Sequence, residues 1–300
     1  MKRNSARTIL LLAGVFWALG FIVNKSVLDS GWTATQLLFV RFFTAAVFMI
    51  LIYSKRIFKA DIATIKSGIK LGIILFLAFA FQTFGLASTT ATNNALITAG
   101  YIVFLPIIVL MIDKKHVKRK ALIASIVTFI GVIVVSIDIH NIGSLNIGDL
   151  FTFIGAIFWA FHIFFQGKDI KGKDPITLMA YQFFVVSILA FLLMMFTDKL
   201  PNVVFTEWNS LRILIGAVVI GFLGSFLAFT FQCMGQQYLS ETETAILISS
   251  ESLFGPILGI ILLNEPFNVQ IVLGMILVLG GITLSELNIE DIQKRRKSKQ

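Results

Sequence analysis

The carboxylate of Glu251 is the side chain best placed to do chemistry, because it lies about ten residues into an apolar stretch that begins near Glu241. At 1.5 Å per helical residue this depth is about 15 Å, close to the middle of a bilayer core. An ionisable group at such depth costs roughly 2.5–3.5 kcal/mol and marks a functional site by default. With its neighbour Ser250, Glu251 is predicted to line a cavity, where it binds a cationic group or carries a proton. The alternative is a protonated or paired structural carboxyl.

Arg41 is a second deep charge, about ten residues from either end of another apolar stretch. Arginine stays charged when buried and finds partners in the protein. We therefore interpret Arg41 as a structural residue that pairs with a carboxylate or with backbone carbonyls. Binding of an anionic substrate group is the alternative.

Polar side chains recur at matched positions. Gln82 and Gln232 lie 150 positions apart, and each offers a donor and an acceptor either to a bound solute or to a neighbouring helix. Asn94 follows the start of an apolar stretch, where it either caps a helix or helps a helix N-terminus to attract an anionic group.

Four rings are candidates for an aromatic wall around a cationic or aromatic solute, through cation–π contact. They are Trp17, Tyr101, Trp159 and His162. Aromatic residues make up 13% of the chain, so packing and lipid contact are the competing explanations for these side chains.

Two matched prolines, Pro106 and Pro256, lie inside apolar stretches and predict helix kinks, because proline lacks a backbone donor. Shared kinks can act as hinges of a rocking motion, or they are static bends. A metal site is not expected, because the three histidines lack ligand spacing and Cys233 is the only cysteine. No nucleotide-binding loop or other cofactor motif occurs.

The elements that hold these residues must be membrane helices. The chain is 57% hydrophobic and only 14% charged, against about 45–50% and about 25% in soluble domains. About 20 apolar residues span a bilayer core, and runs of this kind predict an all-α protein with ten spans. The spans are expected near residues 8–28, 34–53, 68–87, 91–112, 120–138, 148–166, 175–196, 210–234, 241–263 and 268–287.

The basic residues predict the orientation. With ten spans and a cytoplasmic start, 21 of the 25 Lys and Arg residues fall in the cytoplasmic segments, as the positive-inside rule requires. Both termini are therefore expected in the cytoplasm of a bacterial cell, with the spans in its cytoplasmic (inner) membrane. The net charge of +9 lies in short runs between apolar segments, so we do not expect a nucleic-acid partner.

The chain repeats itself. Pro106 and Pro256 share the 150-residue spacing of the glutamines, and the motif FWA at 16–18 recurs at 158–160. The duplication predicts a first five-helix repeat at 1–142, a second at 143–287 and a basic cytoplasmic tail at 288–300. Repeats with an odd number of spans must insert in opposite senses, an arrangement typical of secondary transporters with a site near the midplane.

Three segments carry a family resemblance. They are FWALG at 16–20 leading to Asn24, Arg41 in the second span, and LLNEP at 262–266. In these segments the sequence resembles the drug/metabolite transporter superfamily, specifically the ten-helix EamA-type permeases, over essentially the whole chain. The resemblance implies carrier-type movement of small organic solutes, often outward. It places Glu265 at its usual position, and we group Glu265 with Arg41 as structural or ion-pair residues. The first half departs from the pattern, because Lys115 stands at the equivalent position.

We therefore predict a secondary transporter that works by alternating access around a cavity built by spans one, three, four, six, eight and nine. Its expected role is export of amino acids or related metabolites. The alternatives are an uptake carrier for choline or a vitamin-like solute, and a lipid or glycolipid flippase. An enzyme is not expected, because no serine elbow or metal-binding pair occurs. The expected partners are a small-molecule substrate and the lipid bilayer, and a homo-oligomer stays open.

Overall fold

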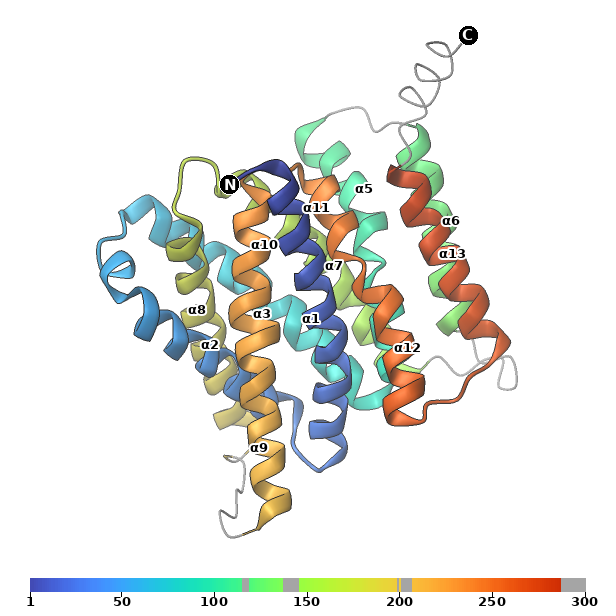
Figure 1. Cartoon of the computed structure of the whole chain (residues 1–300), viewed down its shortest axis with the longest axis horizontal. Coiled ribbons are helices and arrows are strands. Elements are labelled where there is room, and N and C mark those ends of the chain that lie inside the picture. Colours follow the sequence, from blue (N-terminus) through green and yellow to red (C-terminus); the bar gives the residue numbers. More distant parts are fainter. Residues whose placement is uncertain (115–118, 137–145, 199, 201–206, 287–300) are drawn as a thin grey trace.

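The structure is a computed structural model that describes residues 1–114, 119–136, 146–198, 200 and 207–286 (Figure 1). Helices are the only regular elements in this part of the chain. They are α1 (Arg3–Asp29), α2 (Ala34–Ile57), α3 (Ile62–Ser88), α4 (Ala91–Thr98), α5 (Tyr101–Asp113), α6 (Arg119–Ser136), α7 (Ile147–Asp169), α8 (Pro175–Thr197), α9 (Trp208–Ile220), the π-helical η2 (Gly221–Leu227), α10 (Ala228–Gln236), α11 (Glu241–Ile248), α12 (Glu251–Leu263) and α13 (Val269–Glu286). The expected tail at 288–300, Lys115 and most of the loop before α9 lie outside the described residues.

Seven helical segments of the described chain are long and apolar enough to cross a membrane. They are Arg3–Asp29, Ala34–Ile57, Ile62–Ser88, Ala91–Asp113, Ile147–Asp169, Pro175–Thr197 and Trp208–Gln236. Seven of the ten expected spans correspond to them. Phe254–Leu263 and Val269–Gly281 are apolar but shorter, so the full count of ten and the inverted repeat stay predictions.

Polar residues just before the helices fix where several of them begin. The Thr33 hydroxyl accepts a hydrogen bond from the backbone N–H of Gln36, and the side-chain oxygen of Gln36 accepts one from the backbone N–H of Thr33. Thr90 caps α4 in the same way, through the N–H of Asn93. Each cap satisfies a donor that the first helical turn leaves without a partner. The loops therefore specify the helix ends, while the apolar sequence specifies the helices.

The helices pack in pairs. In Figure 1, α2 and α8 lie together on one side of the molecule, and α6 and α13 lie together on the other. Between these pairs, α3 packs along α7, while α1 packs along α10 and α12. The largest cluster of buried apolar side chains extends from these central helices to α2 and α8 and includes Phe79, Trp159 and Phe229.

Two expected spans, 91–112 and 241–263, are each broken near the middle. At the first break Gly100 donates its backbone N–H to the carbonyl of Ile97, three residues back instead of four. Ser250 bonds to Leu247 in the same way at the second break. Such tight turns interrupt a regular α-helix. Each break precedes the matched proline of its segment, Pro106 or Pro256, by about six residues.

Helices α3 and α7 approach so closely that only glycine fits at the contact. A Cβ atom on Gly85 would lie 2.2 Å from Thr152 Oγ1 and 2.7 Å from the carbonyl oxygen of Gly148. The backbone of one helix therefore rests on the backbone of the other. By contrast, a Cβ on Gly280 of α13 would meet no atom within 4 Å.

These two glycines give a matched prediction. We expect Gly85→Ala to lower the free energy of unfolding by about 1–3 kcal/mol, because the new methyl group forces the helices apart. Gly280→Ala should raise it by up to about 1 kcal/mol, through helix propensity alone. Thermal unfolding of the purified variants in detergent measures both. If Gly85→Ala is as stable as Gly280→Ala, the close contact is wrong.

Candidate functional site

A partly open cavity lies between the central helices, with about 450 Å³ of space between the atoms that includes its open side. Its wall combines apolar rings with buried polar groups. The lining residues are Trp17, Gly20, Phe21, Asn24, Arg41, Phe79, Gln82, Thr98, Tyr101, Trp159, Ile163, Gln232, Ile248 and Glu251. A mainly apolar wall with a few polar groups is typical of sites that bind small organic molecules. The wall comes from the six spans expected from the sequence, and Arg41 on α2 adds a seventh.

Glu251 and Tyr101 occupy matched places, as the first residues of α12 and α5. The helix breaks therefore bring the carboxyl of Glu251, 4% exposed, to the N-terminal end of a half-helix that faces the cavity. The partial positive charge of that helix end favours a carboxylate. The Tyr101 hydroxyl donates a 3.3 Å hydrogen bond to the carbonyl oxygen of Ala245 in α11.

Arg41 reaches the cavity from α2. Its Nη2 donates a 3.2 Å hydrogen bond to the hydroxyl of Ser225 in η2, and its guanidinium lies 4.9 Å from the centre of the Phe79 ring. Nε is buried without a partner, and no carboxylate of the described residues forms an ion pair with Arg41. The interpretation of Arg41 as a structural residue did not place its guanidinium in the cavity wall.

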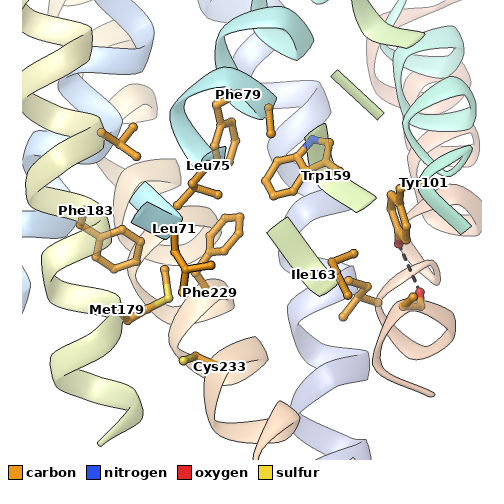
Figure 2. Close-up of a cluster of buried hydrophobic side chains, with 14 of the residues drawn as sticks. Leu71, Leu75, Phe79, Tyr101, Trp159, Ile163, Met179, Phe183, Phe229 and Cys233 are labelled. Carbon is orange, nitrogen blue, oxygen red and sulfur yellow. Dashed lines mark hydrogen bonds between the residues drawn. The ribbon is translucent and has the colours of Figure 1, made fainter. Parts of the chain in front are cut away.

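Aromatic rings of α1, α3 and α7 line one side of the cavity, and Phe229 of α10 packs against them without lining it. Figure 2 shows Phe79, Trp159 and Phe229 facing one another from α3, α7 and α10. The Trp159 and Phe229 rings stack at 5.6 Å, and Phe79 meets Trp159 edge-on at 4.8 Å. Trp17 lies 6.4 Å from Trp159 and donates its indole N–H to the carbonyl oxygen of Gly224 at 2.8 Å. These contacts hold the indole planes in place before any solute binds.

The two matched glutamines differ in their surroundings. Gln82 donates a 2.9 Å hydrogen bond to the hydroxyl of Thr98. The amide of Gln232 is fully buried, and neither its oxygen nor its nitrogen has a hydrogen-bond partner. Asn24 also lines the cavity with a buried carbonyl oxygen that has no partner. The cavity therefore presents unused donors and acceptors.

Three predicted binding residues lie behind the wall instead of in it. Asn94 bonds to the carbonyl oxygen of Gln82 at 3.1 Å and to the Thr152 hydroxyl at 2.7 Å, so it braces α4 against α3 and α7. The Ser250 hydroxyl lies against Gly14 of α1. His162 Nε2 lies 2.7 Å from the amide oxygen of Gln182. The two predicted hinges, Pro106 and Pro256, are within α5 and α12 and are not among the lining residues.

A buried chain of glutamines extends from His162. Gln182 donates to Gln166 at 3.2 Å, and Gln166 donates to Gln236 at 2.5 Å. This chain joins α7, α8 and α10. Sequence reasoning missed it, because isolated glutamines in apolar stretches carry no spacing that identifies their partners. Phe79, Thr98, Ile163 and Ile248 were missed as lining residues for a similar reason, since their types are common throughout the chain.

Glu265 caps a helix of the other half of the chain. Its carboxylate accepts hydrogen bonds from the backbone N–H groups of Ala91, at 2.6 Å, and Thr92, at 3.0 Å. These are the first residues of α4. Among the described residues no ion pair to Glu265 occurs, so its partner is a helix N-terminus instead of a basic side chain. The contact ties the end of α12 to the start of α4.

The fold of the described residues and the cavity define a class, a helical multi-pass membrane protein with a chamber of apolar rings and a few polar groups between its helices. The chain belongs to the EamA-like transporter family, whose model matches residues 5–137 and 146–287. It is 28% identical over 293 residues to an uncharacterized transporter of Archaeoglobus fulgidus, covering 96% of this chain and 88% of that protein. A protein known from a crystal structure shares the fold with a TM-score of 0.74 at 14% identity, over 97% of this chain and 99% of the other. The chain is thus a membrane transporter and not an enzyme.

The helix cap by Glu265 gives a prediction. Glu265→Ala leaves two N–H groups of α4 without their acceptor and should lower the free energy of unfolding by about 1–3 kcal/mol. Glu265→Gln keeps one acceptor but loses the charge, so it should fall between the parent and Glu265→Ala. Unfolding in detergent measures the series.

Glu207 supplies the control for the Glu265 series. It precedes α9, its side chain is exposed, and it makes no side-chain cap bond. Glu207→Ala should leave stability within about 0.5 kcal/mol of the parent. Equal stability of Glu265→Ala and Glu207→Ala would contradict the proposed strength of the cap.

Proposed function

We propose that this transporter moves amino acids or related metabolites outward across the cytoplasmic membrane of a bacterium, by alternating access. One observation carries the proposal: an acidic side chain, Glu251, and a basic side chain, Arg41, line the same cavity. An amino acid carries an ammonium and a carboxylate, so it complements a site that presents one group of each sign. The indole rings of Trp17 and Trp159 supply apolar surface for the rest of the solute.

The presence of Arg41 separates this proposal from uptake of choline. A choline-like solute would suit Glu251 and the aromatic rings. It would not suit a guanidinium in the same wall, because like charges repel in a medium of low dielectric constant. Nothing in the cavity wall favours a lipid over a small solute. Amino acids are therefore the first solutes to test.

Several observations support ten spans in two inverted five-helix repeats. The family model matches twice, over 5–137 and 146–287. The packing is also reciprocal: α3 lies along α7 as α10 lies along α1, and α5 contacts α7 as α12 contacts α1. We place repeat boundaries at 1–142 and 143–287, with a basic tail at 288–300.

Alternating access needs points where helices bend. The breaks before α5 and α12 lie between cavity-lining residues, both helices contain a proline, and the π-helical turn η2 leads into α10, which carries the lining residue Gln232. Discontinuous helices of this kind border the substrate site in secondary transporters. We propose that Pro106 and Pro256 act as the hinges, and that the tie between Glu265 and α4 belongs to the closed state of one entrance.

Removal of the cavity charge tests the proposal. Purified protein in liposomes should transport at least one member of a panel of radiolabelled L-amino acids with saturable kinetics. Glu251→Gln should lower kcat/KM about tenfold or more, because a charge-assisted hydrogen bond is lost. Glu207→Gln makes the same chemical change on an exposed side chain and should transport like the parent. If Glu251→Gln equals Glu207→Gln at every pH, the role of Glu251 is wrong, and if no amino acid moves, the substrate class is wrong.

Cysteine labelling tests the orientation. Cys233 is buried and can be replaced by alanine, after which single cysteines replace the exposed residues Ser30, Lys55 and Lys171. A membrane-impermeant maleimide should label position 30 in intact cells, and positions 55 and 171 only after permeabilisation. The C-terminal end of α2 lies beside the N-terminal part of α8, where the carbonyl oxygen of Ile57 accepts a hydrogen bond from the Tyr181 hydroxyl. Positions 55 and 171 on opposite sides would overturn the inverted repeat.

A further inference from the structure

The difference between the two matched glutamines has a local cause. Thr98 follows Gln82 by 16 residues and ends α4, and Ile248 follows Gln232 by 16 residues and ends α11. Thr98 is the hydrogen-bond partner of Gln82. The equivalent residue beside Gln232 is Ile248, whose side chain has no polar atom. All four residues line the cavity.

A buried amide without partners is costly, because its desolvation is not offset by a hydrogen bond. Buried polar side chains in folded proteins nearly always have a partner, so each exception needs an explanation. Gln232 is an exception at both of its polar atoms, and it is 0% exposed. Its position in the cavity wall offers the explanation: the missing partner is supplied by the solute.

We propose that Gln232 is a specificity-determining residue that binds a carboxamide-like group of the solute, and that Ile248 keeps Gln232 free for this role. The proposal rests on the transport function proposed above and adds the chemical class of one part of the solute. It concerns a single polar contact, and Glu251 and Arg41 remain available for charged groups elsewhere on the same molecule.

The class follows from hydrogen-bond complementarity. A glutamine amide presents one acceptor oxygen beside one donor nitrogen. An ammonium only donates and a carboxylate only accepts, so either would leave one atom of Gln232 unsatisfied. A primary carboxamide or a cis lactam pairs with both atoms at once. A site built for such a group rejects analogues that lack it, because the buried protein atoms then remain unpaired.

The first half of the chain suggests the experiment. Ile248→Thr places a hydroxyl where Thr98 has one, and this hydroxyl should engage Gln232 as Thr98 engages Gln82. Ile248→Val is the matched control, because valine has the shape of threonine without the hydroxyl. Ile248→Thr should therefore melt at a higher temperature than Ile248→Val in the absence of solute, since a buried amide gains a partner.

Binding is measured on the full chain in detergent, from the concentration dependence of the melting temperature. The probes are L-glutamine and nicotinamide, which carry a primary carboxamide. Their counterparts are L-methionine, of similar length, and N,N-dimethylnicotinamide, which lacks the N–H donors. We expect the two carboxamides to bind Ile248→Thr about fivefold to tenfold more weakly than they bind the matched variant Ile248→Val. The counterparts should show no difference between Ile248→Thr and Ile248→Val.

Other outcomes would contradict the solute class or the contact with Gln232. If neither carboxamide stabilises the parent more than its counterpart, the solute class is wrong. If Ile248→Thr binds the carboxamides as Ile248→Val does, Gln232 is not the contact. Should Ile248→Thr fail to fold, Gln232→Met removes both polar atoms at similar volume and must give the same selective loss. Binding through Gln232 without movement in liposomes would support this inference and contradict the proposed transport.

Discussion

The structure depends on one constraint: a helix surface in lipid must be apolar, so polar and charged side chains must find their partners inside the protein. Leu51, Met111 and Phe196 are among the large apolar residues most exposed on the outside. The deep charges Arg41 and Glu251 have turned inward. Because few interior places can hold a charge, both of them line one chamber. The exclusion of these two side chains from lipid and their presence in the cavity wall therefore have the same cause.

The broken helices bring polar groups to that chamber, and the backbone at each break still forms hydrogen bonds. At each break the chain changes from bonds that span four residues to bonds that span three, so most N–H groups keep an acceptor. The new helix that starts after the break directs its N-terminal end at the cavity, and Glu251 occupies such an end. An unbroken helix would offer only side chains there. The break therefore adds backbone polarity to the middle of an apolar element, while the tie of Glu265 to α4 holds a second helix start.

The sequence predicted the helical architecture and six of the nine proposed binding residues now found in the cavity wall, because depth and the 150-residue spacing are visible in one dimension. It did not predict which face of each helix points toward the cavity. Trp159 and His162 are three residues apart and were grouped together, yet only Trp159 lines the cavity while His162 bonds to Gln182 of α8. The helix breaks were also missed, because serine and glycine in an apolar stretch do not reveal a tight turn by themselves.

The positions at which the two halves of the chain differ say more about the candidate site than the positions at which they agree. A chamber with equal halves would present the same groups twice and could not distinguish the two ends of a solute. Here the first residue after the break is Tyr101 in one half and Glu251 in the other, and the glutamine partner is Thr98 in one half and Ile248 in the other. Each difference removes a satisfied, neutral contact from one side and leaves a charge or an unpaired amide. At these two pairs of positions the first half therefore presents satisfied, neutral contacts and the second half presents an acidic group and an unpaired amide, so the two sides of the cavity differ chemically there.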